Sequence, residues 1–227
     1  KGQFMRINAN VPSDYKILGT VNLDYTKYQV TAMAMDYTTG TMYGLTLTSN
    51  VDYNTWESEE HVGQLVTIDL DTGLMTPVAD LDFNEPVFAL ACDKNGQLYA
   101  AGGIMDMYAT STTIYKMDKA TAELTAYTTI EGAGVFTESN YYGSVRYNTQ
   151  LTYDFGTDRL YMNATVTSLY NSRSYGVYMI QLGEEPLVAN LGGISLWTRG
   201  AYEDIKYGDV YLGLMCFIPE EDELPVA

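Results

Sequence analysis

Apolar and polar residues alternate in short runs along most of this chain, and turns rich in Asp, Gly and Thr separate the runs. The stretch MAMDYTTGTMYGL, residues 33–45, shows the pattern: an apolar run ends at an Asp, a glycine turn follows, and a second apolar run carries a Tyr. Alternation with a period of two predicts β-strands, and a short Gly-containing turn between two such runs predicts a hairpin. Helical periodicity is hard to find, so we expect an all-β fold.

This hairpin pattern occurs four times, which indicates a repeat architecture. The repeated turn acids are Asp36, Asp93, Asp154 and Asp204, and the repeated tyrosines are Tyr43, Tyr99, Tyr161 and Tyr211. Successive acids are 57, 61 and 50 residues apart. A second hairpin pattern follows the first three copies, beginning with GQLVTIDLDTG at residue 63, TIYKMDKATAE at 113 and GVYMIQLGEEP at 176.

Two successive hairpins form a four-stranded meander, the unit of a β-propeller blade. The fourth copy lacks its second hairpin, but the stretch GQFMRINANVPSDYKILG, from residue 2, resembles the missing piece. We therefore predict a four-bladed β-propeller over residues 1–218, closed by pairing of the N-terminal strands with the C-terminal hairpin, which removes an open sheet edge. Its parts are a half blade at 2–23, blades at about 29–82, 86–131 and 145–192, and a half blade at 195–217. A fragment of a larger propeller is the alternative.

The outer turn IDLDTG, with the weaker version MDKATAE, resembles the D-x-x-T-G turn of secreted bacterial propeller repeats of the YVTN and PQQ-like kind. The stretch QLGEEP departs from it. The resemblance implies the propeller fold and carries over no catalytic or cofactor residue, since the Trp-rich pattern of quinone-binding propellers is absent. The acidic end PEEDELPVA, residues 219–227, predicts a linker, as in large cell-surface proteins where immunoglobulin-like domains follow a propeller.

Charge limits the partners that we expect. The chain has 12 Lys and Arg against 29 Asp and Glu, a formal net charge of -17, which disfavours nucleic acid and anionic membrane surfaces. No run approaches the roughly 20 apolar residues of a spanning helix, so membrane insertion is not expected. The low basic content favours an extracellular or cell-surface location in a bacterium. Cys92 and Cys216 form no CxxC motif, and we predict both to be buried apolar residues.

The loops that join second to third strands, and each blade to the next, share one face of a propeller. Here they are rich in aromatic and hydrogen-bonding residues, which predicts a surface that binds a glycan or an extracellular protein. The residues proposed to bind the ligand are Tyr53, Trp56, Tyr108, Tyr141, Tyr142, Tyr170, Trp197 and Arg199. Oligomeric state stays open.

The sequence contains few candidate catalytic residues. His61 is the only histidine of the sequence and no nucleophile elbow accompanies it, so a Ser-His-acid triad is not expected. Glu57, Glu85 and Glu138 could supply a pair of loop carboxylates, which keeps a glycoside hydrolase or lyase as the alternative to a non-enzymatic binding or scaffolding module. No cofactor is expected, and a Ca²⁺ ion in the channel stays possible. The four turn acids are expected to cap their own turns.

Overall fold

The computed structural model describes residues 3–8, 10–20, 29–47, 50–51, 58–59, 63–81, 87–103, 111–132, 137–139, 145–147, 149–167 and 173–195. Every regular element in these ranges is a strand, which confirms the predicted all-β fold. In the described part, three sheets have four strands, each strand antiparallel to the one before it in the chain. We call these sheets blades one, two and three.

Blade one consists of β3 (Gln29–Asp36), β4 (Thr41–Leu47), β7 (Gly63–Ile68) and β8 (Met75–Asp80). Blade two consists of β9 (Val87–Cys92), β10 (Leu98–Gly102), β11 (Ser111–Met117) and β12 (Leu124–Glu131). Blade three consists of β15 (Gln150–Asp154), β16 (Arg159–Thr167), β17 (Arg173–Gln181) and β18 (Leu187–Ser195).

Within the described ranges, three two-stranded hairpins accompany the blades. They are β1 (Gln3–Asn8) with β2 (Val11–Thr20), β5 (Asn50–Val51) with β6 (Ser58–Glu59), and β13 (Thr137–Ser139) with β14 (Val145–Tyr147). The β5–β6 hairpin lies within the connection from β4 to β7, and the β13–β14 hairpin lies within the connection from blade two to blade three.

The first strands of the three blades lie together in the middle of the molecule. Strand β9 contacts β3 on one side and β15 on the other, and the remaining strands of each blade follow outward in order. This arrangement is propeller-like. The described residues do not form a closed ring, and residues 196–227, which include the predicted C-terminal half blade, lie outside them.

The core fills the spaces between neighbouring blades. All six residues of β9, VFALAC, are buried, and they divide between two interfaces. Leu90 and Cys92 pack toward blade one, whereas Ala89 and Ala91 pack toward blade three. A strand buried on both faces needs a continuous apolar run, which is what this sequence provides. The prediction that Cys92 is buried is confirmed, and Cys216 lies outside the described residues.

The repeated acids form the hairpin turns as predicted. The carboxylates of Asp36, Asp93 and Asp154 accept hydrogen bonds from backbone N–H groups two residues later. Among the described turns, four follow a D-x-x-T pattern in which the Thr hydroxyl donates to the Asp three residues earlier, at Asp36, Asp69, Asp118 and Asp154. The structural role of the first three repeated acids is confirmed, and Asp204 lies outside the described residues.

Polar contacts between these turns join the blades. Lys119, in the outer turn of blade two, places its Nζ atom 2.7 Å from Oδ2 of Asp36 in the inner turn of blade one. The Asp36 side chain is fully buried, while that of Lys119 is 34% exposed. Between blades two and three, the hydroxyl of Tyr127 donates to the Gly183 carbonyl at 2.8 Å. A more exposed ion pair there joins Lys94 to Asp158 at 3.0 Å.

Gly96 is the residue of this contact region that we expect to tolerate substitution least. Its φ is +80°, and an added Cβ would lie 2.8 Å from Thr38 Oγ1 and 3.1 Å from both Asp36 Oδ1 and Lys119 Nζ. Gly40 has a similar φ of +69° but no atom within 4 Å of an added Cβ. Gly40→Ala should therefore cost only the left-handed backbone strain, about 1 kcal/mol. Gly96→Ala should lower the free energy of urea unfolding by at least about 1 kcal/mol more than Gly40→Ala does, because the added methyl group crowds the atoms around Asp36. Equal losses would show that the region around Asp36 adapts without penalty.

Candidate functional site

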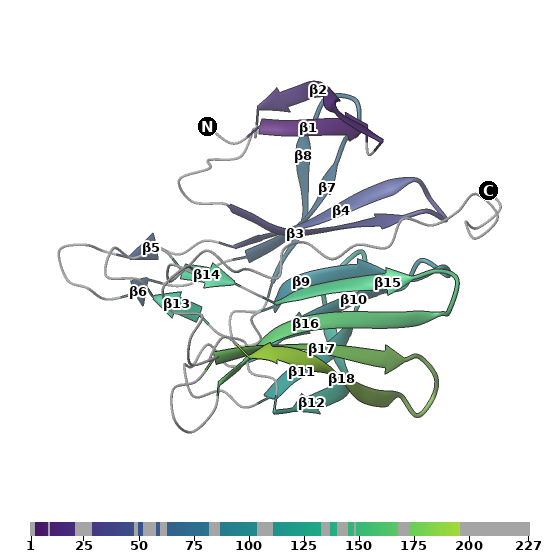
Figure 1. Ribbon diagram of the computed structural model, residues 1–227. Coiled ribbons are helices and arrows are strands. Elements are labelled where there is room, and N and C mark those ends of the chain that lie inside the picture. The colour runs from purple at the N-terminus through teal and green to yellow at the C-terminus, as the bar shows by residue number, and fades with distance from the viewer. Residues whose placement is uncertain are drawn as a thin grey trace.

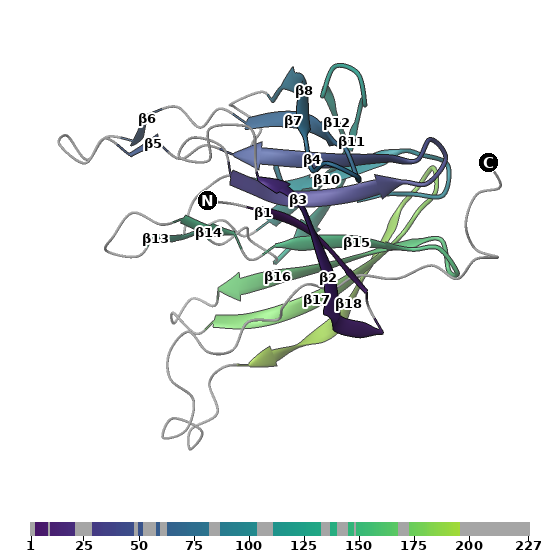
Figure 2. The ribbon, with the colours of Figure 1, turned by 90° about the horizontal axis from the view of Figure 1, so that it is seen from above.

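The two ends of the molecule are built differently. The β5–β6 and β13–β14 hairpins project from one end, which we call the loop end, in both views of the ribbon (Figures 1 and 2). The β3–β4 and β15–β16 turns lie at the opposite end, the turn end. The two projecting hairpins belong to the two classes of connection that the sequence predicted to share one face, so their placement agrees with that prediction.

Several candidate ligand-binding residues are carried by these two hairpins in sequence. Tyr53 and Trp56 fall between β5 and β6, and Tyr141 and Tyr142 fall between β13 and β14. The side chains of all the proposed site residues lie outside the described part of the chain; they are Tyr53, Trp56, Glu57, Glu85, Tyr108, Glu138, Tyr141, Tyr142, Tyr170, Trp197 and Arg199. For Glu138 the backbone is described, opposite Arg146 in the β13–β14 pair. Their assembly into one site stays a prediction.

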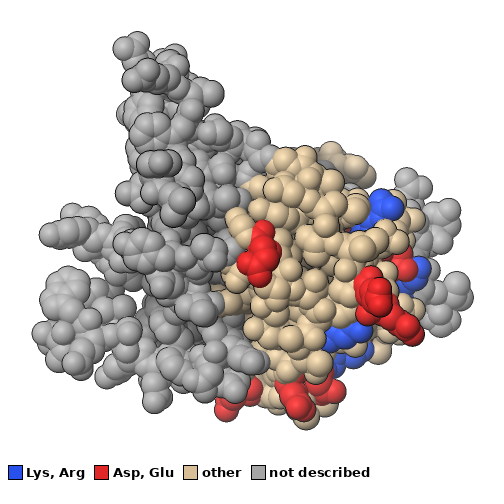
Figure 3. Space-filling view, turned by 90° about the horizontal axis from the view of Figure 1, so that it is seen from below, with Lys and Arg blue, Asp and Glu red and all other residues tan. Residues whose placement is uncertain are grey.

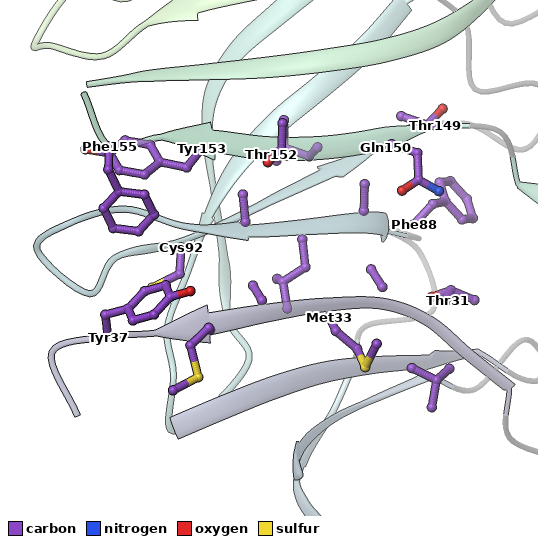
Figure 4. Close-up of a pocket in the computed structure, with 18 residues that line it drawn as sticks. Thr31, Met33, Tyr37, Phe88, Cys92, Thr149, Gln150, Thr152, Tyr153 and Phe155 are labelled. Atoms are coloured by element: carbon purple, nitrogen blue, oxygen red, sulfur yellow. The ribbon is translucent and has the colours of Figure 1, made fainter. Parts of the chain in front are cut away.

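A cavity of about 370 Å³ lies along the first strands of the three blades (Figure 4). At the turn end it is lined by three aromatic rings. Phe155 packs edge-on against Tyr37 at a centroid distance of 5.3 Å and against Tyr153 at 4.7 Å. At the loop end it is lined by polar residues, among them Thr31, Thr149 and Gln150.

The polar lining at the loop end is held by strand-to-strand hydrogen bonds. The backbone N–H of Gln150 donates to Oδ1 of Asn163 at 2.8 Å, and the Thr31 hydroxyl donates to the Leu45 carbonyl at 3.4 Å. The Thr149 hydroxyl is buried without a hydrogen-bond partner in the described structure. A small polar group such as water could therefore be accepted at this end of the cavity.

Sequence analysis missed the aromatic lining, although the repeats contain a signal for it. The residue after the turn acid is aromatic in the first and third copies, Tyr37 and Phe155, and these two rings meet in the structure. The second copy has Lys94 at this position, which instead forms the ion pair with Asp158. One sequence position therefore serves either ring packing or charge pairing between blades.

Burial, hydrogen bonds and neighbouring charges shift the pKa values of ionisable groups at the turn end. Burial opposes ionisation of Asp36, but hydrogen bonds from Lys119, Thr38 and Thr39 outweigh it and hold the pKa of the carboxyl below its ordinary value. Burial, with the negative charges of Asp36 and Asp93 adding to it, raises the pKa of the Cys92 thiol to about 12. That thiol stays protonated at neutral pH and is a poor nucleophile.

Buried tyrosines follow the same trend. Burial raises the pKa of Tyr99 and of Tyr153, and the hydrogen bond from the Tyr153 hydroxyl to Asp158 adds to the increase. Each of these shifts moves a pKa further from pH 7, whereas general acid or base catalysis is most efficient with a pKa near the working pH. Among these groups, the Asp36 carboxylate accepts hydrogen bonds from Lys119 and Thr39, and the Tyr153 hydroxyl donates one to Asp158.

Cation and membrane features are limited in the described ranges. No three His, Cys, Asp or Glu residues there lie close enough to hold a metal ion. No helix there is long and apolar enough to cross a membrane. On the face seen in Figure 3 the described surface is mostly uncharged, with acidic side chains scattered over it and Lys or Arg at a few places.

Comparison with known proteins identifies no family. No family model and no curated protein matches the sequence. One similar solved structure is the GH43 protein BlXynB from Bacillus licheniformis, with 13% identity, a TM-score of 0.42, and coverage of 76% of this chain and 34% of that chain. Another, provisionally described as a 6-phosphogluconolactonase from Bacteroides fragilis NCTC 9343, has 10% identity, a TM-score of 0.37, and coverage of 88% and 64%.

This chain therefore spans about a third of the first of those proteins and under two thirds of the second. With such low identities and scores, the likeness gives no basis for choosing between binding and catalysis. The three described blades alone identify the arrangement as propeller-like.

The lowered carboxyl pKa values predict acid sensitivity. The pKa of Asp36 and that of Asp158 are lower in the folded state than the ordinary value of 3.8, chiefly because hydrogen bonds from Lys119 and from Tyr153 outweigh burial. Such groups stabilise the fold above their unfolded pKa, and the stabilisation is lost as pH falls through the folded pKa. We expect urea midpoints to be constant from about pH 7 to 5 and to fall between about pH 5 and 2. Asp36→Asn should reduce the size of that fall; an identical fall in the variant would contradict the assignment.

Proposed function

We propose that this chain is a four-bladed propeller that acts as a non-enzymatic binding or scaffolding module of a secreted or cell-surface bacterial protein. Its favoured ligand is a glycan, recognised through aromatic residues of the loop end. The observation that carries the proposal is the projection of the β5–β6 and β13–β14 hairpins from one end. These hairpins bracket, in sequence, Tyr53, Trp56, Tyr141 and Tyr142.

The different contacts and connections at the two ends support placing the ligand at the loop end. At the turn end some charged and hydroxyl groups are engaged with one another, as Asp36 is with Lys119 and Thr39, and the Asp36–Lys119 pair joins two blades. The loop end has longer connections between rigid strands, which is where binding residues are commonly found. Tyr and Trp rings can pack on the apolar faces of sugars while their polar atoms form hydrogen bonds. A net charge of -17 favours neutral ligands over polyanions.

A glycan array with the wild type and single variants tests the proposal. Trp56→Ala, Tyr142→Ala and Trp197→Ala should each weaken binding about tenfold or more if the ring is a central contact. Tyr37→Ala is the matched control, because that ring lies at the turn end in the cavity lining and should leave glycan affinity unchanged. Thermal melting of each variant verifies that it is folded.

Three results would contradict the proposal. Binding that is unchanged in all three loop-end variants would exclude this surface. Capture of a protein through the same residues, with no glycan bound, would change the ligand class. Cleavage of a polysaccharide that is abolished by Glu57→Gln, Glu85→Gln or Glu138→Gln would establish the enzymatic alternative.

A further inference from the structure

The N-terminal hairpin has the position of the outer half of a blade. Phe4 of β1 packs against Val66, Ile68 and Met75, on the face of blade one that points away from blade two. A Cβ added at Gly73, in the outer turn of blade one, would lie 2.9 Å from the Phe4 Cβ. Figure 1 shows β1 and β2 beside the ends of β7 and β8. The hairpin therefore lies where a blade preceding blade one would stand.

Contacts between successive blades support this placement. The outer turn of blade three meets the last strand of blade two, where Gly183 bonds to Tyr127. In the same way the outer turn of blade one meets β2, since a Cβ added at Gly19 would collide with the Thr72 carbonyl oxygen. By this correspondence β2 is a fourth strand and β1 is a third strand.

The turn of the N-terminal hairpin fixes the alignment with blade one. Oδ1 of Asn8 accepts a hydrogen bond from the N–H of Asn10 at 3.0 Å. Oδ1 of Asp69 accepts one from the N–H of Asp71, also at 3.0 Å. Asn8 is therefore the counterpart of Asp69, so residues 5 and 7 correspond to residues 66 and 68.

Two surfaces of this hairpin lack, among the described residues, the partners that their counterparts have. In the described structure β1 pairs with β2 alone, whereas β7 pairs with β4 on one edge and β8 on the other. Met5 is 50% exposed and Ile7 is 52% exposed, while the counterparts Val66 and Ile68 are 0% and 6% exposed. Opposite Met5 and Ile7 on β2 stand Ile17 and Tyr15, which are also exposed. An added strand would pair the open N–H and C=O groups of such an edge, and its side chains would extend the exposed apolar face.

We propose that residues 209–215, DVYLGLM, form the second strand of this blade and pair antiparallel with the free edge of β1. The segment belongs to the fourth copy of the inner hairpin, and it lies outside the described residues. A strand from this chain is the occupant that the sequence favours, because residues 209–215 repeat the pattern of β4, β10 and β16, and each of those strands pairs with the third strand of its blade.

The register of this pairing follows from the three complete blades. Each pairs its repeated tyrosine with the residue two before the Asp69-equivalent turn position; the pairs are Tyr43 with Thr67, Tyr99 with Lys116, and Tyr161 with Met179. The rule places Tyr211 opposite Arg6. Leu212 then stands opposite Met5, and Val210 opposite Ile7. The inference rests on the proposed four-bladed fold but not on any ligand.

Amide hydrogen exchange on the wild-type chain tests the pairing. In an antiparallel strand alternate N–H groups point to opposite edges, so half of the β1 amides point toward β2 and half toward the free edge. We expect both sets to be protected to the same degree as the amides of β7. Exchange of the free-edge set at the rate of unpaired amides would overturn the proposal.

Disulfide trapping identifies the occupant and its register. The variants are Met5→Cys with Leu212→Cys and Arg6→Cys with Tyr211→Cys, both in a Cys92→Ala, Cys216→Ala background. Adjacent pairs alternate between close and wide Cα spacing, so one of the two suits a disulfide. The mismatched control is Arg6→Cys with Leu212→Cys, whose side chains would point to opposite faces.

A disulfide within one chain, in a matched variant and not in the control, is the expected result. A disulfide between two chains would show a second copy on this edge and would overturn the proposal, as would equal trapping in the control. Absence of trapping in both matched variants would overturn it when they melt as the wild type does. Where they do not fold, the wild-type exchange measurement decides. Neither experiment involves a ligand, so failure here is separate from failure of glycan binding.

Discussion

The ion pair between Asp36 and Lys119 is the contact on which the geometry of the blades depends most. A carboxylate that is fully buried costs several kcal/mol unless it is paired and hydrogen-bonded. Asp36 meets that need with one partner from another blade and with Thr38 and Thr39 from its own turn. The apolar core between the blades is not directional, whereas this pair requires one relative placement of the two turns. Gly96 leaves the space that the pair occupies.

The other polar and aromatic contacts between blades are either more exposed to water than this ion pair or uncharged. The Lys94–Asp158 pair is 43% and 47% exposed, and pairs so accessible to water contribute little. Tyr127 and Gly183 supply a neutral contact in its place, and rings rather than charges meet at Tyr37 and Phe155. Together these contacts use the turn end for assembly. Residues at the loop end can then vary without disturbing these contacts between blades, and this is why we propose that the ligand binds there.

The sequence predicted the local parts of this structure well and the long-range parts poorly. Alternation and D-x-x-T turns are properties of neighbouring residues, so the hairpins, the turn role of Asp36 and the burial of Cys92 could be predicted. The partner of Asp36 is 83 residues away in the chain, in the turn MDKATAE, which is a weaker version of the D-x-x-T-G pattern, and no local pattern indicates the pairing. The ring contact of Tyr37 with Phe155 was missed for the same reason. Tyr53, Trp56 and the other candidate site residues fall in connections, where strand periodicity gives no register, so their grouping stays a prediction.

A double-mutant cycle on Asp36→Asn and Lys119→Met tests the central claim most directly. Urea unfolding of the wild type, both single variants and the double variant gives the interaction free energy of the two side chains. We expect a coupling of about 1 to 3 kcal/mol, because the Asp36 side chain is fully buried and that of Lys119 is only 34% exposed. Additive losses, with coupling near zero, would contradict the account and would leave the apolar core alone to orient the blades.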